Sequence, residues 1–268
     1  MMVRTLLLAT ALLPAAAMAR DADAIWFGGP IITVDDKTPR AEAVAVKDGK
    51  ITAIGTKAAI LKAERGSATI LHDLAGKTLI PGFFDAHGHF SGVGVQALAA
   101  NLLPPPDGPA QSIPQIQAIM RDYIANSPVV KQYGIAIGFD YDDSQLVEKR
   151  APTRQELDAI STEIPIMLTH QSGHLGAYNS KALAMTGITA DSLNPSGGVI
   201  QREADGKTPN GVLEENAHNA ALGKLFPKLT PADAMRIVTA AQAIYAANGY
   251  TTVQEGRADP GTLALLTG

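Results

Sequence analysis

Residues 81–90, PGFFDAHGHF, combine a Pro-Gly pair, two adjacent phenylalanines, an aspartate and two histidines within ten positions. This stretch ends a short apolar run and places His87 and His89 two positions apart. On an extended strand, residues i and i+2 point to the same side, so both imidazoles, and the carboxylate of Asp85 before them, face one point beyond the strand. Neutral imidazole is the commonest metal-binding side chain. The stretch therefore predicts two metal-binding histidines; a pair of ordinary polar residues in a loop is the alternative.

The composition is that of an ordinary globular protein. The 268 residues are 46% hydrophobic and 18% charged, with a net charge of −4. This balance, without any basic cluster, argues against nucleic acid as a partner. Cysteine is absent, which excludes disulfide bonds and thiolate metal sites. The sequence also lacks a P-loop, a dinucleotide-binding fingerprint and a Gly-x-Ser-x-Gly motif, so we expect none of these chemistries.

Residues 1–19 have the pattern of an export signal. Arg4 supplies a positive charge, residues 5–17 form an apolar stretch, and Ala17-Met18-Ala19 offers the small residues that a signal peptidase recognises. The apolar stretch is shorter than the roughly 20 residues of a membrane-spanning helix, which disfavours the alternative of a membrane anchor. We expect cleavage before Arg20, a periplasmic or secreted location, and no membrane span in the mature chain.

The remaining sequence changes character near residue 78. Residues 20–77 read as short strands and turns, with Asp48-Gly49 predicting a tight hairpin between two alternating apolar runs. After residue 78, strand-like stretches alternate with helical ones. The expected strands are 78–87, 133–141, 164–170 and 249–256, and the expected helices are 112–127, 153–161 and 230–249. Such alternation predicts an α/β fold with a parallel sheet.

Three further motifs accompany residues 81–90. They are residues 165–183 (PIMLTHQSGHLGAYNSKAL), 197–217 (GGVIQREADGKTPNGVLEENA) and 249–256 (GYTTVQEG). As a set, the four stretches resemble amidohydrolase family 3, a family of metal-dependent hydrolases. The resemblance implies an α/β fold with a (β/α)8 TIM barrel over residues 78–268 and a small amino-terminal β-sandwich portion over residues 20–77.

The barrel implied by this resemblance is incomplete. A full (β/α)8 barrel takes about 250 residues, more than lie between residues 78 and 268. The two further histidines and the aspartate that the family carries on later strands have no match here. One hypothesis is therefore a truncated, non-catalytic fragment; another is that the missing carboxyl-terminal half is supplied by a separate polypeptide, or that the chain forms a homo-oligomer.

The resemblance also implies a set of metal ligands. His87 and His89 would bind a divalent metal, with zinc expected, and Glu215 would join them through the pattern Gly211-x-x-x-Glu215. Carboxylate oxygen is a sound zinc ligand. The alternative is that Glu214 and Glu215 begin a solvated helix, where negative charge suits the amino terminus.

Other residues are expected around that metal. By resemblance, His174 contacts substrate or the metal-bound water, Asn179 follows it as a pocket residue, and Asp85 orients a histidine or binds the metal directly. Asp140 ends a predicted strand, where barrel active sites lie, and is expected to bind substrate. For His170, a less regular match to the family, a structural role is the alternative to a place in the pocket. For His218, which is expected on the helix after Glu215, a structural role is the preferred interpretation. The implied reaction is hydrolysis of a carbon–nitrogen bond, other than a peptide bond, in a small amide-type substrate.

Overall fold

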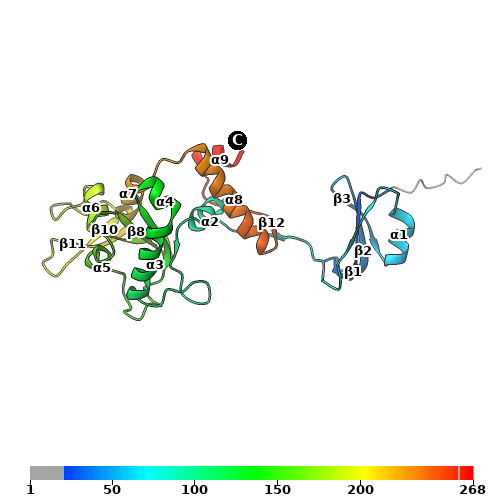
Figure 1. The fold of residues 1–268 in the computed structure, drawn as a ribbon, viewed down its shortest axis with the longest axis horizontal. Coiled ribbons are helices and arrows are strands. Elements are labelled where there is room, and N and C mark those ends of the chain that lie inside the picture. The colour runs from blue at the N-terminus through cyan, green and yellow to red at the C-terminus, as the bar shows by residue number, and fades with distance from the viewer. Residues whose placement is uncertain (1–20, 259, 268) are drawn as a thin grey trace, which may run out of the picture. The chain divides into compact units, whose positions relative to one another are not determined.

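The chain divides into two compact units between Gly82 and Phe83 (Figure 1). The computed structural model describes residues 21–258 and 260–267. The predicted export signal, residues 1–19, lies outside the described residues. Among the described helices, none is both long and apolar enough to cross a bilayer.

The amino-terminal unit is one four-stranded sheet with a single helix. Its elements are β1 (Ala24–Ile32), β2 (Arg40–Lys47), β3 (Lys50–Gly55), α1 (Lys57–Glu64) and β4 (Ile70–Asp73), with strand order β3-β2-β1-β4. The predicted hairpin is confirmed: Asp48 and Gly49 both have positive φ, 50° and 70°, as a two-residue turn between twisted strands requires.

Only one face of this sheet is covered by the unit itself. Ile25, Ala43 and Ala45 pack with Ile60 of α1 in a small core. The other face forms an apolar groove of about 410 Å³ that includes Trp26. Within the described residues no second sheet covers this groove, so the sandwich inferred from the resemblance is not confirmed.

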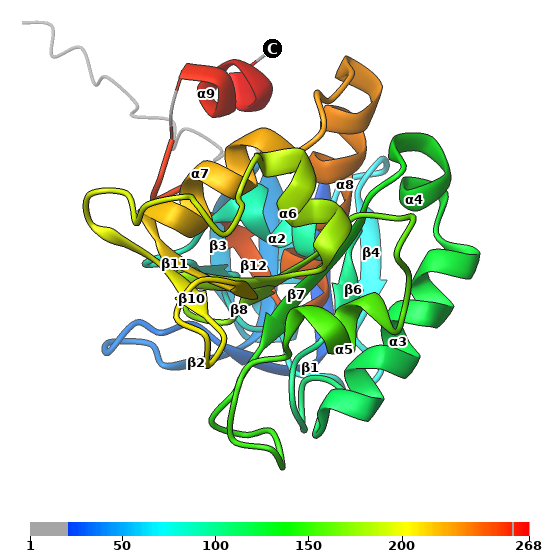
Figure 2. The ribbon, with the colours of Figure 1, turned by 90° about the vertical axis from the view of Figure 1, so that its left-hand side faces the viewer.

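The second unit is built on a six-stranded sheet of order β10-β11-β9-β8-β7-β6 (Figure 2). The strands are β6 (Ala100–Asn101), β7 (Ala136–Tyr141), β8 (Ile166–His170), β9 (Leu175–Tyr178), β10 (Gly198–Arg202) and β11 (Pro209–Glu215). Pairing is parallel across β6, β7 and β8, as predicted, but antiparallel from β8 through β9 and β11 to β10. A fully parallel sheet is therefore wrong for this unit, whose overall class is mixed α/β.

A separate two-stranded parallel sheet joins β5 (Phe83–Phe84) to β12 (Tyr250–Thr252). These are the predicted strands at 78–87 and 249–256, much shortened. The helices of the unit are α2 (Phe90–Gln96), α3 (Ile113–Asn126), α4 (Pro128–Tyr133), α5 (Arg154–Asp158), α6 (Ser180–Thr186), α7 (Asn216–Leu225), α8 (Pro231–Ala247) and α9 (Pro260–Thr267).

The three predicted helices begin where their capping residues are. Ser112 caps α3, and Thr153 and Thr230 form capping boxes with Glu156 and Asp233 at the starts of α5 and α8. In each box the threonine and the acidic residue satisfy each other's backbone N–H groups, which fixes the first turn.

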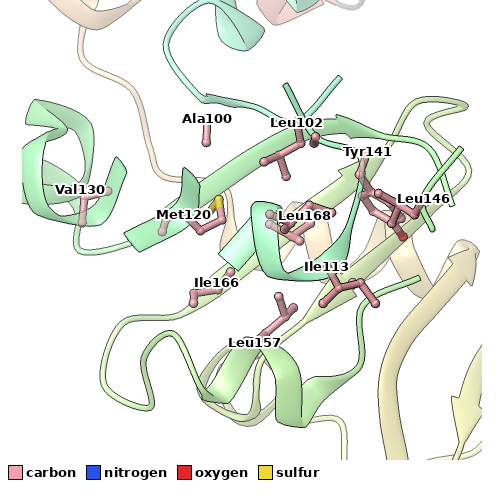
Figure 3. Close-up of a cluster of buried hydrophobic side chains, with 14 residues drawn as sticks. Ala100, Leu102, Ile113, Met120, Val130, Tyr141, Leu146, Leu157, Ile166 and Leu168 are labelled. Atoms are coloured by element: carbon pink, nitrogen blue, oxygen red, sulfur yellow. The ribbon is translucent and has the colours of Figure 1, made fainter. Parts of the chain in front are cut away.

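Two apolar clusters bury the sheet on both faces. Helices α3 and α5 cover one face, where Leu168 packs against Met120 and Leu157 (Figure 3). Helices α6 and α7 cover the other face, over Met167. All residues of β8 are buried, as expected for a central strand with helices on both sides. This packing on both faces fixes the positions of the carboxyl ends of β7 and β8.

Candidate metal and substrate site

A cleft of about 940 Å³ lies in the second unit, at the carboxyl ends of β7 and β8. This is the end of a parallel sheet at which α/β enzymes bind their ligands. Its walls carry the imidazoles and carboxylates of His89, Asp140, His170, His174, Glu215, His218 and Glu255, with Thr169 beside them. The sequence motifs far apart along the chain thus meet at one place.

His89 enters the cleft just before α2. Its Nδ1 lies 3.6 Å from Glu255 Oε1, and the rings of His87 and His89 are 5.6 Å apart between centroids. Glu255 also accepts hydrogen bonds from Ser91, at 2.9 Å from its N–H and 2.5 Å from its hydroxyl. Burial opposes ionisation of Glu255, but these hydrogen bonds outweigh it and lower the pKa of Glu255. An ionised carboxylate therefore lies beside the ring of His89.

His174 and Glu215 form a second pair on the wall of the cleft. The Nδ1 of His174 lies 3.0 and 3.1 Å from the two carboxylate oxygens of Glu215. The Glu215 N–H also donates to the His174 carbonyl, at 2.6 Å. Both side chains are more than half exposed, 66% and 55%, so the pair is open to a ligand.

The backbone of Glu215 is strained. Its φ of 50° and ψ of −122° belong to a region that favours glycine, and the residue joins the end of β11 to the first turn of α7. A side chain kept in such a conformation costs about 1–3 kcal/mol and points to a function for that side chain.

The Glu215→Gly variant should therefore be more stable than the Glu215→Ala variant, by about 1–2 kcal/mol in the free energy of unfolding. Both variants remove the carboxylate, but only glycine relieves the strain. Urea denaturation of the two variants measures the difference. Equal stabilities would show that the backbone relaxes at no cost.

Asp140 is the extra residue of a bulge near the end of β7. The register with β8 shifts between Phe139 and Tyr141, and Asp140 has a φ of 71°. Bulges commonly redirect a side chain beside an active site. Burial raises the pKa of the Asp140 carboxyl from 3.8 to about 6.

This raised pKa predicts a pH dependence. The folded protein holds the Asp140 proton more tightly than the unfolded chain, so the contribution of Asp140 to stability falls as pH rises from about 4 to about 6. Asp140→Asn should raise the melting temperature at pH 7.5 and leave it unchanged at pH 4. Thermal melts at the two pH values test this; an equal effect at both would contradict it.

His170 lies at the end of β8 with two aspartates near it. Ligand atoms of Asp142, Asp143 and His170 all lie within 4.8 Å of one another, which makes them a possible metal-binding group among the described residues. Asp142 is buried, and both of its oxygens already accept hydrogen bonds, from Ser144, Gln145 and Gln171. Its role is thus to fix the loop.

Unpartnered polar atoms gather at the cleft. Among the described residues, five buried side-chain polar atoms have no hydrogen-bond partner, and three belong to cleft residues: Thr169 Oγ1, His170 Nε2 and His218 Nε2. Of these, His170 Nε2 lies 3.3 Å from the Asp143 carboxylate, so Thr169 Oγ1 and His218 Nε2 are the two without any polar contact in the part of the chain that the structure describes. Buried polar groups are almost always satisfied in folded proteins. Their concentration here, beside open imidazole and carboxylate donors, fits a site that binds a metal or a polar ligand.

Two of the predicted residues do not reach the cleft wall. His87 is exposed, and Asp85 accepts hydrogen bonds from the His87 N–H at 3.2 Å and from the Tyr245 hydroxyl at 3.1 Å. Asp85 therefore contacts the backbone of a histidine and not its ring. The carboxylate beside the ring of His89 is instead that of Glu255.

Asn179 does not have the expected pocket role. Its side chain is fully buried and makes four hydrogen bonds, from Ile166 N and Ala182 N to Oδ1 and from Nδ2 to the carbonyls of Ser161 and Ile164. All of its hydrogen-bonding capacity is thereby used. The prediction that Asn179 binds substrate is corrected to a structural role, in which it caps α6 and ties β8 to the preceding loop.

Comparisons with known proteins identify relatives of this chain. The model of the amidohydrolase family matches residues 71–267. The N-substituted formamide deformylase of Arthrobacter pascens is 34% identical over 75% of this chain and 36% of its own length. The exoenzymes regulatory protein AepA of Pectobacterium carotovorum is 32% identical over 76% of this chain and 43% of its own.

Solved structures show a related fold. A metal-dependent hydrolase from Pyrococcus horikoshii superposes with a TM-score of 0.62 at 22% identity, covering 91% of this chain and 44% of that one. The chain thus spans less than half the length of the relatives and structures it matches.

Proposed function

The chain belongs to the amidohydrolase family, and from that premise we propose that it is a metal-dependent hydrolase of carbon–nitrogen bonds, other than peptide bonds, in small amide-type substrates. The observation that carries the proposal is the cleft at the ends of β7 and β8, with its imidazoles, carboxylates and unpartnered polar atoms. We further propose that the parallel strands belong to a (β/α)8 barrel and the amino-terminal sheet to a β-sandwich.

The donor set fits a divalent metal. Imidazole nitrogen and carboxylate oxygen are the ligands that zinc takes in catalytic sites. From the resemblance to the family we assign the metal to His87, His89 and Glu215. The rings of His87 and His89 lie edge to face with centroids 5.6 Å apart, and Glu215 shares the cleft with His89, but the three side chains do not form a closed ligand group among the described residues. When bound, such a metal lowers the pKa of a coordinated water and polarises a substrate carbonyl. Zinc is the metal we propose.

The chain's own groups supply the proton transfers. Amide hydrolysis requires a group that accepts a proton from water and one that delivers a proton to the leaving nitrogen. His174, fixed at Nδ1 by Glu215, presents its Nε2 for this exchange. Asp140, with a pKa of about 6, holds or releases a proton near neutral pH and is suited to bind a polar substrate group. Asp85 positions the backbone of His87.

A non-catalytic fragment is the second candidate. The chain covers 36% of the deformylase relative, and the sheet ends within the described residues at β6 and β10 without closing. Unpaired strand edges favour association with another chain, so a homo-oligomer or a separate carboxyl-terminal half belongs to this hypothesis. Export to the periplasm or medium is proposed from residues 1–19 alone.

Metal content and hydrolysis of the purified chain decide between the two. We expect one divalent metal per chain and hydrolysis of at least one member of a panel of N-substituted formamides and acetamides. A chelator should abolish the hydrolysis and added zinc restore it. A folded chain that binds metal but hydrolyses nothing would favour the fragment, and one that binds no metal would contradict the proposed function.

A further inference from the structure

Thr169 and His218 both line the cleft and both lie next to Gly176, although they are far apart in sequence. Antiparallel pairing of β8 with β9 places Thr169 opposite Gly176, and opposed residues project to the same face of a sheet. A Cβ on Gly176 would meet Cε1 and Nδ1 of His218 at 2.6 Å. The imidazole therefore occupies the space above Gly176, next to the side chain of Thr169.

The imidazole of His218 is fixed by Tyr178. The tyrosine hydroxyl lies 2.6 Å from His218 Nδ1 and 3.5 Å from the His218 carbonyl, and we infer from the shorter distance that the hydroxyl proton is donated to the ring. Nδ1 is then an acceptor, and the proton of the neutral ring sits on Nε2. Burial lowers the pKa of His218 to about 4, which keeps the ring neutral at pH 7.

Both free polar atoms of this pair lack a partner. His218 is fully buried and Thr169 is 7% exposed, and neither Nε2 nor Oγ1 has a hydrogen bond within the described residues. The two groups do not bond to each other, yet both residues line the cleft. Gly176 leaves space for the imidazole, and Tyr178 binds its Nδ1, so the position of the ring is fixed by two other residues.

We propose that Thr169 and His218 form a two-donor site that binds an acceptor oxygen of the substrate, a carbonyl or carboxylate oxygen of an amide-type compound. The site is separate from the proposed metal ligands. It rests on the proposed function for the identity of the ligand, because the cleft is the same one. The pair would fix the orientation of a substrate in the cleft without taking part in proton transfer.

Nuclear magnetic resonance of the full chain labelled with ¹⁵N-histidine tests the proposal, with acetate and acetamide as probes. We expect the Nε2–H tautomer for His218 and a saturable shift of its Nε2 resonance with at least one probe. Thr169→Val should weaken that probe's binding by about tenfold, the loss of one good hydrogen bond. The other tautomer, or no shift with either probe because only a water fills the space, would overturn it.

Stability provides a test that needs no ligand. Thr186 is also buried, but its hydroxyl donates to the Leu183 carbonyl at 2.7 Å, which makes Thr186→Val the matched control. We expect Thr186→Val to lower the urea midpoint and Thr169→Val to leave it unchanged or raise it. An equal loss in both variants would mean that Thr169 has an internal partner, and would overturn the site.

Neither measurement uses metal or hydrolysis. An inactive, metal-free chain whose His218 Nε2–H still responds to a probe would contradict the proposed function and leave the two-donor site standing. An active chain without that response would do the reverse.

Discussion

Asn179→Ala is expected to lower the free energy of unfolding by about 3–5 kcal/mol. The fully buried amide joins four backbone groups, two N–H donors and two carbonyl acceptors, from two stretches of the chain, residues 161–166 and the first turn of α6. Alanine leaves all four without a partner in the interior, and each unsatisfied group costs about 1–3 kcal/mol when water cannot reach it. Urea denaturation followed by circular dichroism measures the loss.

The control is another asparagine in the same unit. Asn126 is exposed at the end of α3 and donates one hydrogen bond to Asp122, so Asn126→Ala should cost less than about 0.5 kcal/mol. Asn179→Asp keeps the acceptor and loses both donors, so it should also be strongly destabilising. If Asn179→Ala behaved like Asn126→Ala, the amide would have a role other than structural.

The case of Asn179 shows where sequence reasoning stops. Local signals gave correct elements: the Asp48-Gly49 turn and the threonines before α5 and α8 act through neighbours within a few residues. Strand direction after β8 is different. Whether β9 runs parallel or antiparallel depends on the tight turn through Gly173, with a φ of 71°, and on pairing with β11 some forty residues later. No periodicity within one strand carries that information.

The site divides in the same way. The spacing of His87 and His89 was visible in one strand, and Glu215 was visible by its motif. The roles of Glu255 and His218 could not be predicted, because they come from contacts with Ser91 and Tyr178, 164 and 40 positions away in the sequence. One signal for His218 does exist in the sequence: Gly176 interrupts a buried strand, and glycine within a strand often marks the close approach of another group.

The largest functional effect is expected at the proposed metal ligands. His87→Ala, His89→Ala and Glu215→Ala should each weaken zinc binding by more than about 100-fold, because even partners of ligands are worth 10–100-fold in affinity. Each variant removes one donor from a set that needs at least three protein ligands for a catalytic zinc. Competition with a chromophoric chelator measures the affinity of the folded chain, independently of any hydrolytic activity.

Two other histidines serve as comparisons for the zinc-affinity measurement: His72 as a control and His170 as a rival ligand. His72 lies on β4 of the amino-terminal unit, stacked on Trp26 with ring centroids 4.6 Å apart, so His72→Ala should leave zinc affinity unchanged. His170 belongs to the rival group with Asp142 and Asp143. Because hydrogen bonds from Ser144, Gln145 and Gln171 already occupy Asp142, a metal there would have to displace them, and we expect His170→Ala to reduce affinity less than His89→Ala. The opposite order would move the metal to the end of β8 and refute the assignment to His87, His89 and Glu215.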